Sequence, residues 1–266
     1  MEAWAPSWIP PLVGNPVPLG RTVFLSDLHL GMGREEPSRR ADLAALLEEL
    51  PGNADDLVVG GDMFEFWWEW RNALPRGFDD VLDGFRQLTR AGVRLRLIAG
   101  NHDFALGQGL ASRCGAIIHP DGLLGRSEGA DWLLVHGDAS TPAERADRIL
   151  RRILRSKFCQ GAWNLLPCDV SFPLALGVGR GSRALDDGTS PHTPAMEPTM
   201  RGWMRRWSLA GVVHGHSHRP LWTQGPEGTY INNGDWVRGR WAVWLRGRQS
   251  RLVDCTGKDR PWLSNI

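Results

Sequence analysis

The stretch DLVVGGD, residues 56–62, is an apolar run that ends in two glycines and an aspartate. A short aliphatic run between polar turns predicts a fully buried strand. Four more runs of this kind, each followed by Asp, Asn or His, are RTVFLSD at 21–27, VRLRLIAGNHD at 93–103, DWLLVHGD at 131–138 and AGVVHGHSH at 210–218. The sequence therefore predicts a set of buried strands that carry polar side chains at their carboxyl ends.

Helical patterns alternate with the early strands. Residues 38–50 and 77–92 have apolar residues at helical spacing, with Ser38 as the expected N-cap of the first helix and Pro51 after its end. Late strands are expected at 228–236 and 240–247. Strands that alternate with helices and are followed by more strands indicate a layered α/β domain.

Two segments depart from this alternation. Residues 1–20 are rich in proline and are expected to form an irregular arm before a main domain over 21–266. Residues 139–205 are expected to form an insertion folded over that domain, beginning with a helix over 142–158 that has an apolar stripe and many arginines. Such a helix either lies on an anionic membrane or packs on the domain with its arginines in water.

Composition restricts the partners and the compartment. The chain has 266 residues and a net charge of +1, so no global field favours nucleic acid, and no protein partner is implied. The four cysteines form no CxxC pair, which indicates reduced thiols and a cytoplasmic protein. The first 20 residues lack the features of a signal peptide, and no apolar run approaches the roughly 20 residues of a transmembrane helix.

The polar strand ends are candidates for a metal site, because the carboxyl ends of strands in such sheets converge on one crevice. A single Asp or His at a strand end is more often structural, so the joint pattern is what indicates function. Asp, Asn and His without thiolates suit Mn²⁺, Fe²⁺ or Zn²⁺. The candidates outnumber the ligands of one ion, and two ions roughly 3.5–4 Å apart with a bridging carboxylate are common in phosphoryl chemistry.

The motifs DLH, GD, GNHD, HGD and GHSH, in this order, resemble the calcineurin-like metallophosphoesterase superfamily. The resemblance implies a four-layer α/β/β/α sandwich with a helical cap insertion and two divalent metal ions, with Mn²⁺ favoured over Fe or Zn. Matched by motif, one ion is bound by Asp27, His29 and His218, and the other by Asn101, His136 and His216. Asp62 bridges the two ions. His214 lies outside the usual pair and is expected to be structural or to support a ligand.

Two further residues of GNHD are expected to be catalytic. His102 follows Asn101 and is not needed as a ligand, so it is expected to bind a phosphoryl oxygen or protonate the leaving group. Asp103 is expected to fix the tautomer of His102 and keep it cationic. Asn101 and His102 are also the expected polar contacts of the substrate.

A narrower resemblance is carried by GDMFEFWWEWRNALPRGF (61–78), GNHDFALG (100–107), SKFCQGAWNLLP (156–167) and YINNGDW (230–236). These segments resemble the UDP-2,3-diacylglucosamine diphosphatase family, in its branch with GNHD; the best-studied branch has Arg where this chain has His102. The resemblance implies cleavage of an acylated UDP-sugar to UMP and an acyl-sugar 1-phosphate in lipid A synthesis, with a cap over the acyl chains and peripheral contact with the inner membrane. The rival readings are a phosphoesterase for soluble phosphoesters such as nucleotides, a phosphoprotein phosphatase, and a scaffold without activity.

Five aromatic rings follow Asp62 within residues 64–70. Phe64 and Phe66 are expected to pack in the core. Trp67 and Trp68 cannot both point inward in an extended segment, so at least one is expected to be exposed to ligand or membrane. Both are therefore candidate substrate contacts, beside the reacting phosphate.

Overall fold

The computed structural model describes residues 16–33, 36–70, 73–138, 140, 156, 159, 161 and 193–256. Most of the expected cap, nearly all of its helix over 142–158, and residues 1–15 of the expected arm lie outside the described residues. Within them, no helix is long and apolar enough to cross a membrane.

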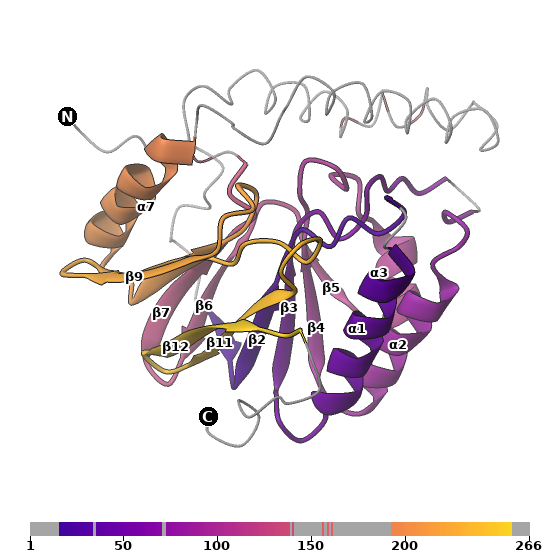
Figure 1. The fold of residues 1–266 in the computed structure, drawn as a ribbon, viewed down its shortest axis with the longest axis horizontal. Helices are drawn as coiled ribbons and strands as arrows, with labels where there is room; N and C mark the ends of the chain where they lie inside the picture. The colour runs from indigo at the N-terminus through magenta and orange to yellow at the C-terminus, as the bar shows by residue number, and fades with distance from the viewer. Residues whose placement is uncertain are drawn as a thin grey trace.

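Two six-stranded sheets form the centre of the molecule (Figure 1). The first sheet has, in spatial order, β12 (Gln249–Asp254), β11 (Trp241–Arg246), β2 (Thr22–Leu25), β3 (Asp56–Gly60), β4 (Arg94–Ile98) and β5 (Ile117–His119). The second has β1 (Val17–Leu19), β6 (Leu123–Ser127), β7 (Ala130–Leu134), β8 (Gly211–His214), β10 (Gly228–Asn232) and β9 (Leu221–Gly225). Strands β2 to β5 are parallel, as are β7, β8 and β10, so the expected strand ends meet at one end of both sheets.

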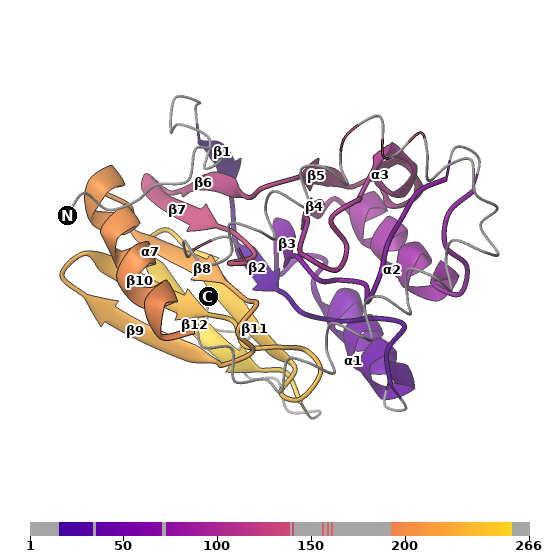
Figure 2. The ribbon, with the colours of Figure 1, turned by 90° about the horizontal axis from the view of Figure 1, so that it is seen from above.

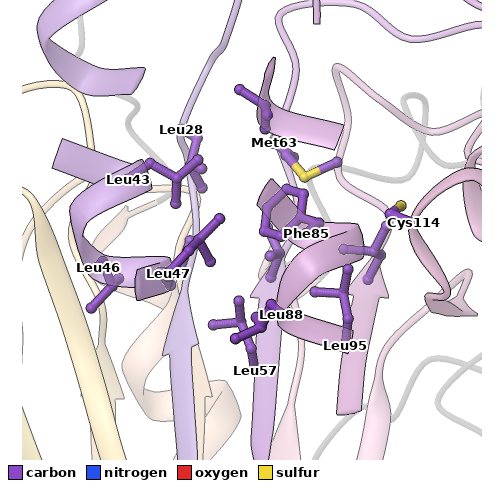
Figure 3. Close-up of a cluster of buried hydrophobic side chains, with 14 of the residues drawn as sticks. Leu28, Leu43, Leu46, Leu47, Leu57, Met63, Phe85, Leu88, Leu95 and Cys114 are labelled. Atoms are coloured by element: carbon purple, nitrogen blue, oxygen red, sulfur yellow. The ribbon is translucent and has the colours of Figure 1, made fainter. Parts of the chain in front are cut away.

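Helices cover the outer face of each sheet (Figure 2). The first sheet is covered by α1 (Glu36–Glu49), α2 (Asp79–Arg90) and α3 (Gln108–Cys114), and the second by α7 (Thr193–Trp207). Neighbouring residues of β3 face opposite sides: Leu57 joins the core under the helices, where Phe85 and Leu88 of α2 contribute (Figure 3), and Val58 joins the core between the sheets. Both faces are covered, which explains the continuous apolar runs of these strands.

The three apolar cores separate four layers. The core between the sheets includes Phe24 and Ile98 of one sheet and Trp132 of the other, and the third core packs Met200 and Trp203 of α7 on the second sheet. The expected α/β/β/α sandwich is therefore confirmed.

Three local expectations need adjustment. Helix α1 begins at Glu36, whose Oε1 accepts the N–H of Gly31 at 2.9 Å, so Ser38 is inside the helix and is not its N-cap. Val17–Leu19, within the expected irregular arm, form strand β1 and pair with β6. Residues 193–205, within the expected insertion, belong to α7, whose buried side chains make it the outer layer of the second sheet.

Candidate active site

The seven residues matched as metal ligands come together at the carboxyl ends of the strands. Asp27, His29 and His218 offer ligand atoms that all lie within 4.8 Å of one another, and Asp27, Asp62 and His136 form a second group of this kind. Asn101 and His216 adjoin His136: Asn101 Oδ1 is 3.0 Å from His136 Nε2, and the rings of His136 and His216 are 5.1 Å apart. The structure thus gathers residues that are 191 positions apart in the chain.

Asp62 lies between the two groups of expected ligands. Its Oδ2 atom is 3.9 Å from Nε2 of His29 on one side and 3.4 Å from Nε2 of His136 on the other. The side chain is buried. A carboxylate between two groups of ligands can bind a cation on each side, so the position of Asp62 fits a bridging ligand.

The arrangement of the donor atoms favours a positive charge at the centre of the site. His136 Nδ1 must donate to the Gly60 carbonyl at 2.9 Å, because a carbonyl oxygen only accepts. In the neutral ring, the lone pair of Nε2 then faces Asn101 Oδ1 at 3.0 Å, which places two acceptors in contact. Nε2 of His29 and Nε2 of His218 lie 3.5 Å apart, a distance at which one of the two can donate to the other. A proton or a metal cation resolves the contact at His136, so the residues fit divalent ions.

Electrostatics favour the same conclusion. Burial by itself raises the pKa of Asp27, but contact with His218 outweighs it and lowers the pKa. Burial likewise opposes the charged form of His136, but the nearby Asp62 carboxylate raises its pKa to about 9. Asp27 is therefore ionised at neutral pH, as is Asp62, whose pKa is lowered despite its burial by the nearby His136, and these two carboxylates attract cations.

The turns that carry the ligands have an unusual backbone. Asp27, His29, Asp62, His216 and His218 all have positive φ, between 44° and 66°. Left-handed backbone is uncommon outside glycine and costs energy that the surrounding fold must offset. Its concentration on five expected ligands indicates that the fold holds these side chains in place for function.

Glycines beside the ligands have a steric role. A Cβ atom on Gly100 would lie 2.1 Å from Oδ1 of Asp62, and one on Gly215 would lie 2.1 Å from Oδ2 of Asp27. The glycines of GNHD and GHSH therefore let the backbone approach the two carboxylates. In addition, the backbone N–H of His216 donates to Asp27 Oδ2 at 3.0 Å, which joins the second sheet to the first at the site.

Two ligand imidazoles, those of His29 and His218, lie beside carboxylates that no sequence motif above includes as site residues. Glu65 Oε2 is 3.3 Å from Nδ1 of His29, and Asp235 Oδ2 is 3.8 Å from Nδ1 of His218. Both carboxylates are buried. Partners of this kind fix the orientation of a metal-binding imidazole. The sequence contains both residues, in GDMFE and NNGDW, but it does not show that their carboxylates point toward the site.

The structure brings His102 to the site but corrects the expected role of Asp103. His102 Nδ1 donates to the carbonyl of Glu65 at 3.1 Å, so this carbonyl, and not Asp103, fixes the tautomer. The Asp103 carboxylate instead accepts backbone N–H groups of four residues, at 2.8 to 3.3 Å: Asp62, Met63, Phe64 and Gly100. Asp103 therefore ties the loop after β3 to the loop after β4, and the expectation that it orients His102 is wrong.

His102 also lies within ligand distance of the expected metal site. One nitrogen of its ring, one of His29 and an oxygen of Asp62 lie within 4.8 Å of one another. The geometry thus allows His102 to be either a ligand or a residue that faces the substrate. Mutation of His102 would lower the metal content of the protein in the first case and leave it unchanged in the second.

The aromatic segment after Asp62 is part of the core. Trp67 is fully buried and stacks on Phe64 with ring centroids 4.2 Å apart, which confirms the core position of Phe64; Phe66 is half-buried. Trp68 is also buried, 6.2 Å from the ring of Phe104. The expectation that Trp67 or Trp68 is exposed is wrong, because the segment has bends and is not an extended strand in which neighbours must point in opposite directions.

His214 is structural, in agreement with its place outside the ligand pair. Its Nε2 is hydrogen-bonded to the hydroxyl of Tyr230 at 2.8 Å, and the ring is fully buried. Burial lowers the pKa of His214 to about 3, so the imidazole is neutral.

Comparisons with known proteins agree with the site. The calcineurin-like phosphoesterase family matches residues 20–220. UDP-2,3-diacylglucosamine hydrolase of Pseudomonas paraeruginosa is 32% identical over 241 residues, which is 83% of this chain and 93% of the relative. The proteins of the same name from Aeromonas hydrophila and Edwardsiella ictaluri are 31% and 30% identical, over 87% and 75% of this chain and 97% and 76% of the relatives. This chain therefore belongs to the calcineurin-like phosphoesterase family, and it is a phosphohydrolase.

Proposed function

We propose that the chain hydrolyses the pyrophosphate bond of UDP-2,3-diacylglucosamine, giving UMP and 2,3-diacylglucosamine 1-phosphate for lipid A synthesis. The observation that carries this proposal is its similarity to relatives named UDP-2,3-diacylglucosamine hydrolase over most of their length. All of the gathered site residues fall within the segment that matches the phosphoesterase family.

The proposal assigns the seven gathered residues to two divalent ions, with Mn²⁺ first and Fe or Zn as alternatives. The ligand groups are those matched by motif: Asp27, His29 and His218; Asn101, His136 and His216; and the bridging Asp62. When bound, two such ions activate water and neutralise charge on the phosphoryl oxygens. The protein contributes the fixed positions of the ligands, through strained turns and buried carboxylate partners.

His102 is the proposed acid of the reaction. With Nδ1 held by the Glu65 carbonyl, its other nitrogen is available to a phosphoryl oxygen or to the leaving group. Asn101, the neighbouring residue, serves as ligand and as a second contact of the phosphate. Asp103 has no direct part in this proposal, because its oxygens hold backbone groups.

Recognition of the acyl chains is assigned to the insertion and to the nearby rings. We place the cap within residues 139–192, before α7 begins. The basic amphipathic pattern over 142–158 supports peripheral contact with an anionic membrane from the cytoplasmic side. Among the expected ring contacts Trp68 remains a candidate, whereas Trp67 is stacked in the core.

The test compares the purified protein on two substrates, UDP-2,3-diacylglucosamine and a small chromogenic phosphodiester. We expect UMP and the acyl-sugar 1-phosphate as products, with a much higher kcat/KM on the acylated substrate. Replacing Leu150 and Leu154 with Ser should then reduce turnover of the acylated substrate far more than turnover of the diester. Equal losses, or a preference for soluble nucleotides, would support the alternative of a phosphoesterase for soluble substrates.

A further inference from the structure

Glu65 touches two parts of the site from one position in the loop after β3. Its carboxylate lies 3.3 Å from Nδ1 of His29 and 4.0 Å from Nδ1 of His102, and its carbonyl accepts from His102 Nδ1 at 3.1 Å. Its own N–H donates to the carbonyl of Leu30, one residue beyond His29, at 2.9 Å. The residue is buried, with 7% of its surface exposed.

From this geometry we infer that Glu65 is a positioning residue of the site, which sets the orientation of the ligand His29 and of the catalytic candidate His102. A buried carboxylate is unfavourable unless a polar partner compensates for its desolvation. Here the carboxylate faces the nitrogen of His29 that is turned away from Nε2, the atom directed at Asp62 and His218. At 3.3 Å, Oε2 of Glu65 is close enough to favour a proton on Nδ1 of His29, which would leave the Nε2 lone pair to the metal.

The backbone of Glu65 extends this role to His102. Because a carbonyl only accepts, Nδ1 of His102 carries the proton in this contact. The N–H of the same residue is fixed to the loop of His29. Glu65 therefore sets the spacing between His29, a ligand of one proposed ion, and His102, the proposed acid. The centroids of these two rings are 5.0 Å apart, and their planes meet at 85°.

Glu69 offers a matched control, since it is a carboxylate in the same loop with a different task. It accepts the N–H groups of Gly107, Gly109 and Leu110 at 2.8, 2.7 and 3.0 Å, at the start of α3. Removing Glu69 should weaken the loop without touching an expected ligand. A difference between the two variants therefore separates positioning of the site from general support of the loop.

The experiment measures binding of Mn²⁺ by chelator competition, together with thermal unfolding, for the wild type, Glu65→Ala, Glu65→Gln and Glu69→Ala. The inference rests on the metal site of the proposed function but not on its substrate. We expect Glu65→Ala to lower the affinity for one of two ions by about 10–100-fold, the usual cost of losing such a partner. Glu65→Gln keeps an acceptor oxygen and should lose clearly less, and Glu69→Ala should bind both ions as the wild type does, with a lower melting temperature.

Four results would overturn the inference in distinguishable ways. Wild-type affinity in Glu65→Ala would show that Glu65 does not position His29. An equal loss in Glu69→Ala would show a general effect of the loop. If Glu65→Ala does not fold, Glu65→Gln is compared with the wild type instead. Unchanged affinity of Glu65→Gln for both ions, with a lower melting temperature, would show that the carboxylate contributes only to packing. Failure of the wild type itself to bind two ions would instead remove the proposed metal site and this inference with it.

Discussion

Two regions meet at Asp62, and different interactions determine their structures. On one side are the turns that carry the expected ligands, where five residues have left-handed backbone and carboxylates pack against glycine. On the other side is the aromatic segment over 64–70, where Trp67 stacks on Phe64 in a dry core. The backbone of the ligand turns is strained, which lowers stability but places polar atoms at the site. The buried rings of the aromatic segment stabilise the fold close by.

The comparison teaches that adjacency in sequence does not mean a shared role. Phe64 and Trp67 follow a proposed metal ligand closely, yet they lie in the core under α2, where Phe78 is 4.8 Å from Phe64. Carboxylates divide in the same manner. Asp62 faces the ligands, whereas Asp103 and Glu69 hold backbone N–H groups.

The largest effect is expected from the ligand side. Asp62→Ala removes the carboxylate that lies between His29 and His136. We expect kcat/KM to fall by more than the roughly 10²–10³-fold that loss of a single stabilising donor costs, because both proposed ions are affected. Steady-state kinetics with metal analysis checks this. Activity within tenfold of the wild type, with two ions retained, would contradict a bridging role.

The next largest effect is expected on the aromatic side, in stability and not in catalysis. Trp67→Ala should lower the free energy of unfolding by about 3–5 kcal/mol, because it removes a fully buried indole. Chemical denaturation measures this change, and KM for the acylated substrate should stay near the wild-type value in protein that remains folded. A large rise in KM without loss of stability would restore the rejected interpretation, in which this ring contacts the ligand.

His102→Ala tests the boundary between ligand and catalyst. We expect kcat to fall by about 10²–10⁴-fold, the range of an acid–base residue, while metal content stays at the wild-type value. The measurement is kcat alongside metal analysis of the same preparation. Loss of one ion in this variant would make His102 a ligand, as its distance to His29 and Asp62 also permits.

The smallest effect is expected from Glu69→Ala. The variant leaves the start of α3 without the acceptor of three backbone N–H groups, which should cost about 0.5–2 kcal/mol of stability. Denaturation in urea, compared with Glu48→Ala on the exposed face of α1, measures the cost of the lost acceptor. A urea unfolding midpoint equal to that of Glu48→Ala would show that α3 does not depend on this carboxylate.

Much of the site was predictable because its chemistry is local to each strand end. The apolar run over 56–62 predicts β3, and the convergence of parallel strands places Asp62 near Asn101 and His136. The four-layer sandwich followed from the resemblance and is what three separate cores require. Helix α7, by contrast, was expected in an insertion, since an amphipathic pattern does not reveal which surface it covers.

The errors concern the directions of side chains. Asp103 adjoins His102 in the sequence, but the turn after β4 points its carboxylate to backbone N–H groups of the neighbouring loop. Trp67 and Trp68 were treated as an extended pair, and bends in the chain let both be buried. Glu65 and Asp235 were missed because their contacts depend on loop paths that no periodicity specifies.

The most direct test of the central claim is a crystal structure of the wild type with Mn²⁺, with anomalous difference density to locate the ions. The account predicts two peaks, roughly 3.5–4 Å apart, on either side of the Asp62 carboxylate. One should be bound by Asp27, His29 and His218, and the other by Asn101, His136 and His216. A single peak, or a peak coordinated by His102 in place of these residues, would contradict the proposed site.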